Sequence, residues 1–147
     1  MSIKSVGALI DWTSNVHGSL ARCLESAVAA GPEELAGQLL EYLAGHEQRL
    51  ATIIAGFAAQ GEDRALHTRV YDYYVSPPVA VEEMCGKPWQ SMTFDQISQE
   101  VLAVHNQVME LFRYLIGRAA IPEELELLQA LLDAEEGETR QMAQQLN

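Results

Sequence analysis

The chain has few basic residues, and this shortage excludes several classes of partner. Lysine and arginine number 9 against 21 aspartates and glutamates, so the formal net charge of the 147-residue chain is −12. Phosphate backbones and anionic lipid surfaces repel such a protein. We therefore expect no nucleic-acid partner and no binding to a membrane surface.

Cysteines and long apolar runs are scarce as well. The two cysteines, Cys23 and Cys85, do not form the closely spaced pairs that build zinc sites or redox dithiols. We expect Cys23 to be a small apolar core residue and Cys85 to be a thiol that is reactive only if exposed. No segment approaches the ~18 uninterrupted apolar residues of a membrane span. These features together predict a cytoplasmic protein.

Four long segments carry apolar residues at the 3.6-residue spacing of amphipathic helices, and we expect one domain over residues 1–147. The first ends at Gly31. The second opens at Pro32 and runs to about Gln60, the third is capped by Thr93 and Gln96, and the fourth opens at Pro122. The four stripes consist of Leu9, Thr13, Val16, Leu20, Leu24 and Ala27; Leu40, Leu43, Glu47, Leu50 and Ile54; Ile97, Val101, His105, Val108, Phe112 and Leu115; and Leu128, Leu131, Glu135, Glu138 and Met142.

The connections between these helices predict their topology. Two are short, whereas the middle one covers about residues 61–92 and is too long for a turn. It contains Tyr71, Tyr73, Tyr74, Pro77, Pro78, Pro88 and Trp89. We expect it to pack across the outside or end of the bundle, with a short helix around residues 79–85. Two antiparallel hairpins joined by one long crossover form the ferritin-like four-helix bundle, an all-α fold.

A weak internal repeat with an offset of 88 residues relates the two hairpins. It carries His17 onto His105 and Glu47 onto Glu135, so that each half places a histidine and a glutamate at equivalent positions. The match indicates that the four side chains face a shared axis.

The chain resembles the rubrerythrin-like branch of the ferritin-like superfamily in these stretches. In that family, helices one and three each carry a metal-binding glutamate about seven residues before an aromatic residue, and helices two and four each carry Glu-x-x-His. Here His17 and His105 stand at the glutamate positions, seven residues before Leu24 and Phe112. Glu47 and Glu135 keep their glutamates but are followed by Leu50 and Glu138 instead of histidine. The resemblance implies the fold, with altered metal-binding motifs.

Polar residues at core positions need partners, because an unpaired charge in a protein interior costs several kcal/mol. One hypothesis is a metal site in which His17 and His105 supply nitrogens while Glu47, Glu135 and Glu138 supply oxygens, a set suited to iron, manganese or zinc. The alternative is a hydrogen-bonded cluster of protonated histidines and glutamates, or a looser one whose glutamates reach solvent. His46 is expected to face solvent, or to be a ligand if the helix is rotated by one residue.

Two functions follow from these alternatives. The first is a non-catalytic interaction or regulatory module with no metal. We expect it to form a homodimer through the apolar helix faces and the tyrosine-rich crossover, and the acidic helix face at residues 123–138 would suit a basic protein partner. The second is a metal-dependent redox or stress-response protein. The sequence identifies no nucleophile-base pair and no catalytic residue, so the first interpretation leans away from an enzyme.

Overall fold

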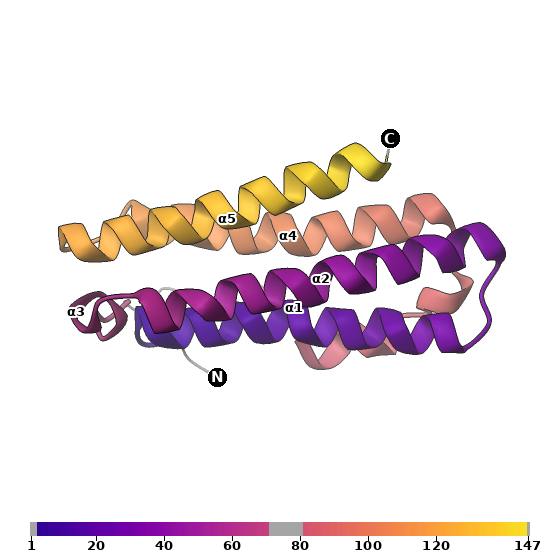
Figure 1. The fold of residues 1–147 in the computed structure, drawn as a ribbon, viewed down its shortest axis with the longest axis horizontal. Helices are drawn as coiled ribbons and strands as arrows, with labels where there is room; N and C mark the ends of the chain where they lie inside the picture. Colours follow the sequence, from indigo (N-terminus) through magenta and orange to yellow (C-terminus); the bar gives the residue numbers. More distant parts are fainter. Residues whose placement is uncertain (1–2, 71–80, 147) are drawn as a thin grey trace.

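The computed structural model describes residues 3–70 and 81–146, which form a bundle of four long α-helices (Figure 1). These are α1 (Val6–Ala29), α2 (Glu34–Gln60), α4 (Phe94–Ile116) and α5 (Pro122–Leu146). A short helix α3 (Asp63–Leu66) and two 3₁₀ turns, η1 (Val81–Gly86) and η2 (Trp89–Ser91), lie in the long connection. The expected all-α fold is confirmed.

The predicted helix starts are close to the observed ones. Thr93 caps α4 by accepting from the backbone of Gln96, whose side chain in turn accepts from the backbone of Thr93. Helix α5 begins at Pro122, and Glu124 in its first turn accepts a hydrogen bond from the backbone N–H of Ala120. Gly31 ends the first hairpin turn with φ of 76°, a left-handed conformation that glycine adopts without strain.

The long connection changes the direction of the second hairpin. Helix α2 ends beside α3 at one end of the bundle, whereas α4 begins at the other end, so α2 and α4 run in parallel (Figure 1). The two 3₁₀ turns pack against α1, and α3 packs at the end of the bundle against α1 and α5. The described parts of the crossover, α3, η1 and η2, therefore pack against the outside and the end of the bundle, as expected.

The crossover differs in detail from the prediction. The helix expected around residues 79–85 is the 3₁₀ turn η1, and α3 was not predicted. Trp89 is buried and donates from Nε1 to the carbonyl oxygen of Met84 at 2.7 Å. Tyr71, Tyr73, Tyr74, Pro77 and Pro78 lie outside the described residues.

Candidate metal centre

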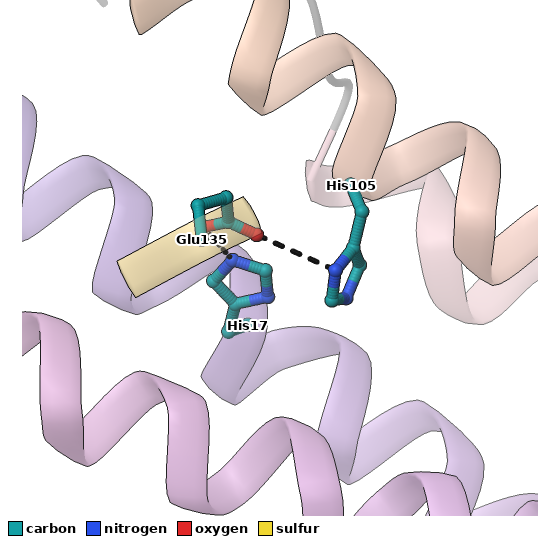
Figure 2. Close-up of side chains that lie close together, drawn as sticks. All are labelled: His17, His105 and Glu135. Atoms are coloured by element: carbon teal, nitrogen blue, oxygen red, sulfur yellow. Dashed lines mark hydrogen bonds and ion pairs between the residues drawn. The ribbon is translucent and has the colours of Figure 1, made fainter. Parts of the chain in front are cut away.

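Four polar side chains meet in the middle of the bundle, one from each long helix. His17 on α1, Glu47 on α2, His105 on α4 and Glu135 on α5 are all 0% exposed. The helical spacing that buries the apolar stripes turns these four positions to the same axis. Figure 2 shows both imidazole rings directed toward the Glu135 carboxylate. The inward register predicted for these four residues is the one observed.

Glu47 bridges the two histidines. Its Oε1 lies 2.7 Å from Nδ1 of His17, and its Oε2 lies 2.7 Å from Nε2 of His105. Both carboxylate oxygens thus accept a short, charge-assisted hydrogen bond from an imidazole N–H.

Glu135, on α5, contacts the same two histidines. Its Oε1 accepts from Nε2 of His17 at 2.9 Å, while its Oε2 is 3.4 Å from Nδ1 of His105. Oε2 of Glu135 is buried without a hydrogen-bond partner. A buried carboxylate oxygen that lacks a donor is a free position for a cation.

Thr139 is the residue of this cluster that sequence reasoning missed. Its hydroxyl donates to the main-chain oxygen of Glu135 at 2.7 Å and lies 2.7 Å from Nδ1 of His105. Because the hydroxyl proton is already donated, Nδ1 of His105 must be the donor to Thr139. Nε2 of His105 also donates, to Glu47, so the hydrogen bonds assign a proton to both ring nitrogens. The sequence signal for this role is that Thr139 follows Glu135 by four residues, one helical turn, so both lie on the same face of α5.

The charges in the cluster stabilise one another. Burial by itself lowers the pKa of His17, but the negative charges of Glu135 and Glu47 outweigh it and raise that pKa to about 10. Burial alone would raise the pKa of Glu47, and the facing His105 and His17 instead hold it far below its usual range. The raised pKa of His17 and the lowered pKa of Glu47 mean that a protonated imidazole faces an ionised carboxylate in this cluster at neutral pH.

A second group of side chains adjoins the core cluster. His46 was expected to face solvent, and this is wrong: it is 2% exposed, its ring centroid 6.3 Å from that of His105 and 6.2 Å from that of Tyr42. Its Nδ1 accepts from Nη2 of Arg49 at 3.0 Å. Burial lowers the pKa of His46. His46 and Arg49, which flank Glu47 in the sequence of α2, therefore add a neutral imidazole and a cation beside the central cluster.

Glu138 belongs to this outer group rather than to the central four. Its side chain is 19% exposed, and its Oε2 lies 3.6 Å from Nη2 of Arg49 and 3.8 Å from Nδ1 of His46. Among the described residues, potential ligand atoms of His17, His105 and Glu135 lie within 4.8 Å of one another. Glu138 is not in that group.

The two cysteines were expected to be free, and this prediction is wrong. Cys23 of α1 and Cys85 of η1 form a disulfide, with Cα atoms 4.9 Å apart, so Cys23 is not a free apolar residue and Cys85 is not a free thiol. The sequence alone could not pair them, because 62 positions separate the two residues. Disulfides persist chiefly in oxidising compartments, and a cytoplasmic location stays a prediction.

Comparison with solved structures identifies the architecture. The chain matches a Thermotoga maritima protein proposed to be a ferritin-like diiron-carboxylate protein, with a TM-score of 0.61 and 13% identity over 98% of this chain and 95% of that chain. The fold is ferritin-like. At this identity the likeness concerns the fold alone and does not extend to the rubrerythrin-like branch in particular. No protein-family model and no curated protein sequence matches the chain.

Among the described residues, no helix is long and apolar enough to cross a membrane.

Proposed function

We propose that this ferritin-like chain binds a divalent transition metal at the centre of its bundle and serves in redox or stress chemistry. His17, Glu47, His105 and Glu135 would hold the ion. The observation that carries this proposal is the convergence of imidazole nitrogens and a carboxylate oxygen from three helices within 4.8 Å, all buried.

The chemistry of the donor set fits such a metal. Imidazole nitrogens together with carboxylate oxygens suit iron, manganese and zinc, whereas calcium and magnesium prefer oxygen alone. Oε2 of Glu135 is already without a hydrogen-bond donor. Thr139 also supplies a support for His105, since a ligating histidine is usually oriented by a hydrogen bond at its other ring nitrogen.

The charge of the cluster supports the same proposal. Two carboxylates, Glu47 and Glu135, face two imidazole rings whose nitrogens all have hydrogen-bond partners in reach. Replacing the extra proton on each imidazole by one divalent cation leaves the net charge of the buried site unchanged. Metal binding therefore need not place an uncompensated charge in the bundle, which would be strongly unfavourable.

The residues of the chain would bind and orient the ion and keep bulk water from it, because all four side chains are fully buried. Bound iron or manganese would supply one-electron redox chemistry, and bound zinc would act as a Lewis acid. The Thermotoga maritima neighbour is proposed to be a diiron-carboxylate protein, and this description supports iron as the metal.

Interpretation as a non-catalytic interaction module draws no support from the comparisons or the site. The homodimer and the protein partner stay predictions of the sequence.

Elemental analysis tests the proposed function. The chain would be produced with iron, manganese and zinc in the medium, desalted and measured by mass spectrometry of the elements. We expect about one ion per chain in the parent protein and a loss of roughly tenfold or more in a His17→Gln, His105→Gln variant. Less than about a tenth of an ion per chain in the parent protein would end the proposal.

The matched control is His67→Gln. His67 is exposed at the end of α3 and bonds through Nδ1 to the main-chain oxygen of Asp63, so its replacement changes the histidine content away from the centre. This variant is expected to retain the full metal content. Circular dichroism of all variants would show whether loss of metal accompanies loss of helix.

A further inference from the structure

Arg49 lies at the edge of the central cluster. Its side chain is 55% exposed, yet its Nη2 reaches inward to lie 3.0 Å from Nδ1 of His46 and 3.6 Å from Oε2 of Glu138. The guanidinium thus lies beside two groups, an imidazole and a carboxylate, of the kinds that serve as metal ligands in proteins.

The hydrogen bonds show that the imidazole is already engaged. A guanidinium can only donate, so Nδ1 of His46 accepts from Arg49 with its lone pair. A neutral imidazole has one such lone pair, so Nε2 of His46, which is buried without a hydrogen-bond partner, carries the N–H and offers a metal no lone pair. Oε2 of Glu138 is buried and has no hydrogen-bond partner, and the Arg49 guanidinium is the positive group beside it.

We propose, on the basis of the metal-binding function above, that the centre holds one metal ion and that the Arg49 guanidinium occupies the position of a second cation beside Glu138. The chain is then a single-metal variant of a ferritin-like centre, with a tethered organic cation in place of a second ion. Arg49 determines how many ions the protein binds.

Charge balance distinguishes one ion from two. The carboxylates of the combined cluster are those of Glu47, Glu135 and Glu138, and the charge of one divalent ion together with that of Arg49 balances them. A second divalent ion in place of the guanidinium would leave one excess positive charge in a largely buried site. Neutrality therefore favours a single ion.

The ligand count leads to the same conclusion. Three residues after Glu135, α5 supplies Glu138, whereas three residues after Glu47, α2 supplies Leu50, which is apolar and 0% exposed. Unless it shared Glu47 or Glu135 with the first ion, a second ion would have only Glu138 and His46 as ligands. Transition-metal sites in proteins usually have three or more protein ligands.

Metal stoichiometry in a charge-reversal variant tests this inference. Arg49→Glu removes the cation and adds a carboxylate, so that two divalent ions would balance the charges of the site. The full chain would be loaded without oxygen with Fe²⁺, and separately with Mn²⁺ and Co²⁺, desalted and measured for bound metal per chain. We expect about one ion in the parent protein and about two in Arg49→Glu.

Two matched variants isolate the effect of position. Arg64→Glu changes the net charge by the same amount at an exposed position on α3, and it should remain at about one ion. Arg49→Lys keeps a cation and should also remain at about one ion. Glu138→Gln should keep its single ion, because on this proposal Glu138 pairs with Arg49 rather than ligating the metal.

The outcomes separate the two proposals. About two ions in the parent protein, a single ion in Arg49→Glu, or loss of the ion in Glu138→Gln would overturn the inference and leave the metal-binding function standing. Failure of the parent protein to bind any of the metals would overturn both. Circular dichroism spectra matching the parent protein would show that each variant is folded.

Discussion

The imidazole rings of His17 and His105 lie edge to face in the bundle, with their centroids 5.0 Å apart and their planes at 69°. They occupy equivalent positions in the two hairpins, 88 residues apart in the sequence. Each ring contacts both Glu47 and Glu135, so the weak sequence repeat corresponds to a nearly symmetric cluster of four side chains.

Metal affinity should rise with pH. A metal can bind His17 only after a ring proton leaves, and the pKa of His17 is raised to about 10. Proton and metal therefore compete throughout the neutral range, and uptake of the metal should release protons into a weakly buffered solution. Titration with Zn²⁺ or Mn²⁺ against a chromophoric chelator between about pH 6 and pH 9 measures the affinity. An affinity that is constant across this range would contradict the assigned ligands.

The metal-free chain should lose stability both in alkali and in acid. His17 has a folded-state pKa of about 10 against 6.5 for the unfolded chain, so its contribution is complete below pH 6.5 and is lost as the pH rises to about 10. The pKa of Glu47 is lowered from 4.5, so its contribution is complete above pH 4.5 and is lost as the pH falls further. Thermal unfolding measured with a metal chelator present should show greatest stability near pH 4.5–6.5. A melting temperature that rises steadily from neutral pH to pH 9 or so would contradict this.

Replacement of Glu47 by leucine should destabilise the metal-free protein. The variant leaves His17 and His105 without the acceptor that both share, and removing one member of a buried ion pair costs about 3–5 kcal/mol. Urea unfolding measures the change. Glu41→Leu, at an exposed position of the same helix, is the control and should change stability by less than about 0.5 kcal/mol. Unchanged or increased stability in Glu47→Leu would mean that the buried cluster does not stabilise the folded protein.

Replacement of Thr139 by valine should weaken the support of His105. Valine keeps the shape of the side chain but removes the oxygen that accepts from Nδ1 of His105, at a cost of about 1 kcal/mol in the free energy of unfolding. Metal affinity should fall about tenfold or more, because the ring loses the bond that orients it. Thr139→Ser retains the hydroxyl and should restore both properties. A Thr139→Val variant with the affinity of the parent protein would exclude this orienting role.

Reduction of the disulfide should loosen the crossover. The bond between Cys23 and Cys85 closes a loop across 62 positions, and a loop of this size stabilises a folded chain by about 2–4 kcal/mol. Dithiothreitol should therefore lower the melting temperature of the parent protein, whereas a Cys23→Ala, Cys85→Ala variant should be insensitive to it. Free thiols detected in the unreduced, denatured protein would show that the pair does not form.

The helices and the central four residues could be predicted from the sequence because they depend on local periodicity. His17, Glu47, His105 and Glu135 occupy positions in apolar stripes, and a helix turns every residue of a stripe to the same side. The Thr93 cap and the lengths of the connections then determined where helices begin and which hairpins form. These signals lie within a few residues of one another, so no knowledge of distant contacts was needed.

Only the tertiary structure decided the burial of His46, the pairing of the cysteines and the contact between Arg49 and Glu138. Burial of His46 depends on how closely α2 approaches α4 and α5, and the pairing of Cys23 with Cys85 depends on the path of the crossover over α1. Arg49 is exposed by its position on α2, yet its flexible side chain reaches a carboxylate on α5. Such contacts join residues on separate elements, and the packing of those elements, rather than the local pattern of either one, sets the distance between them.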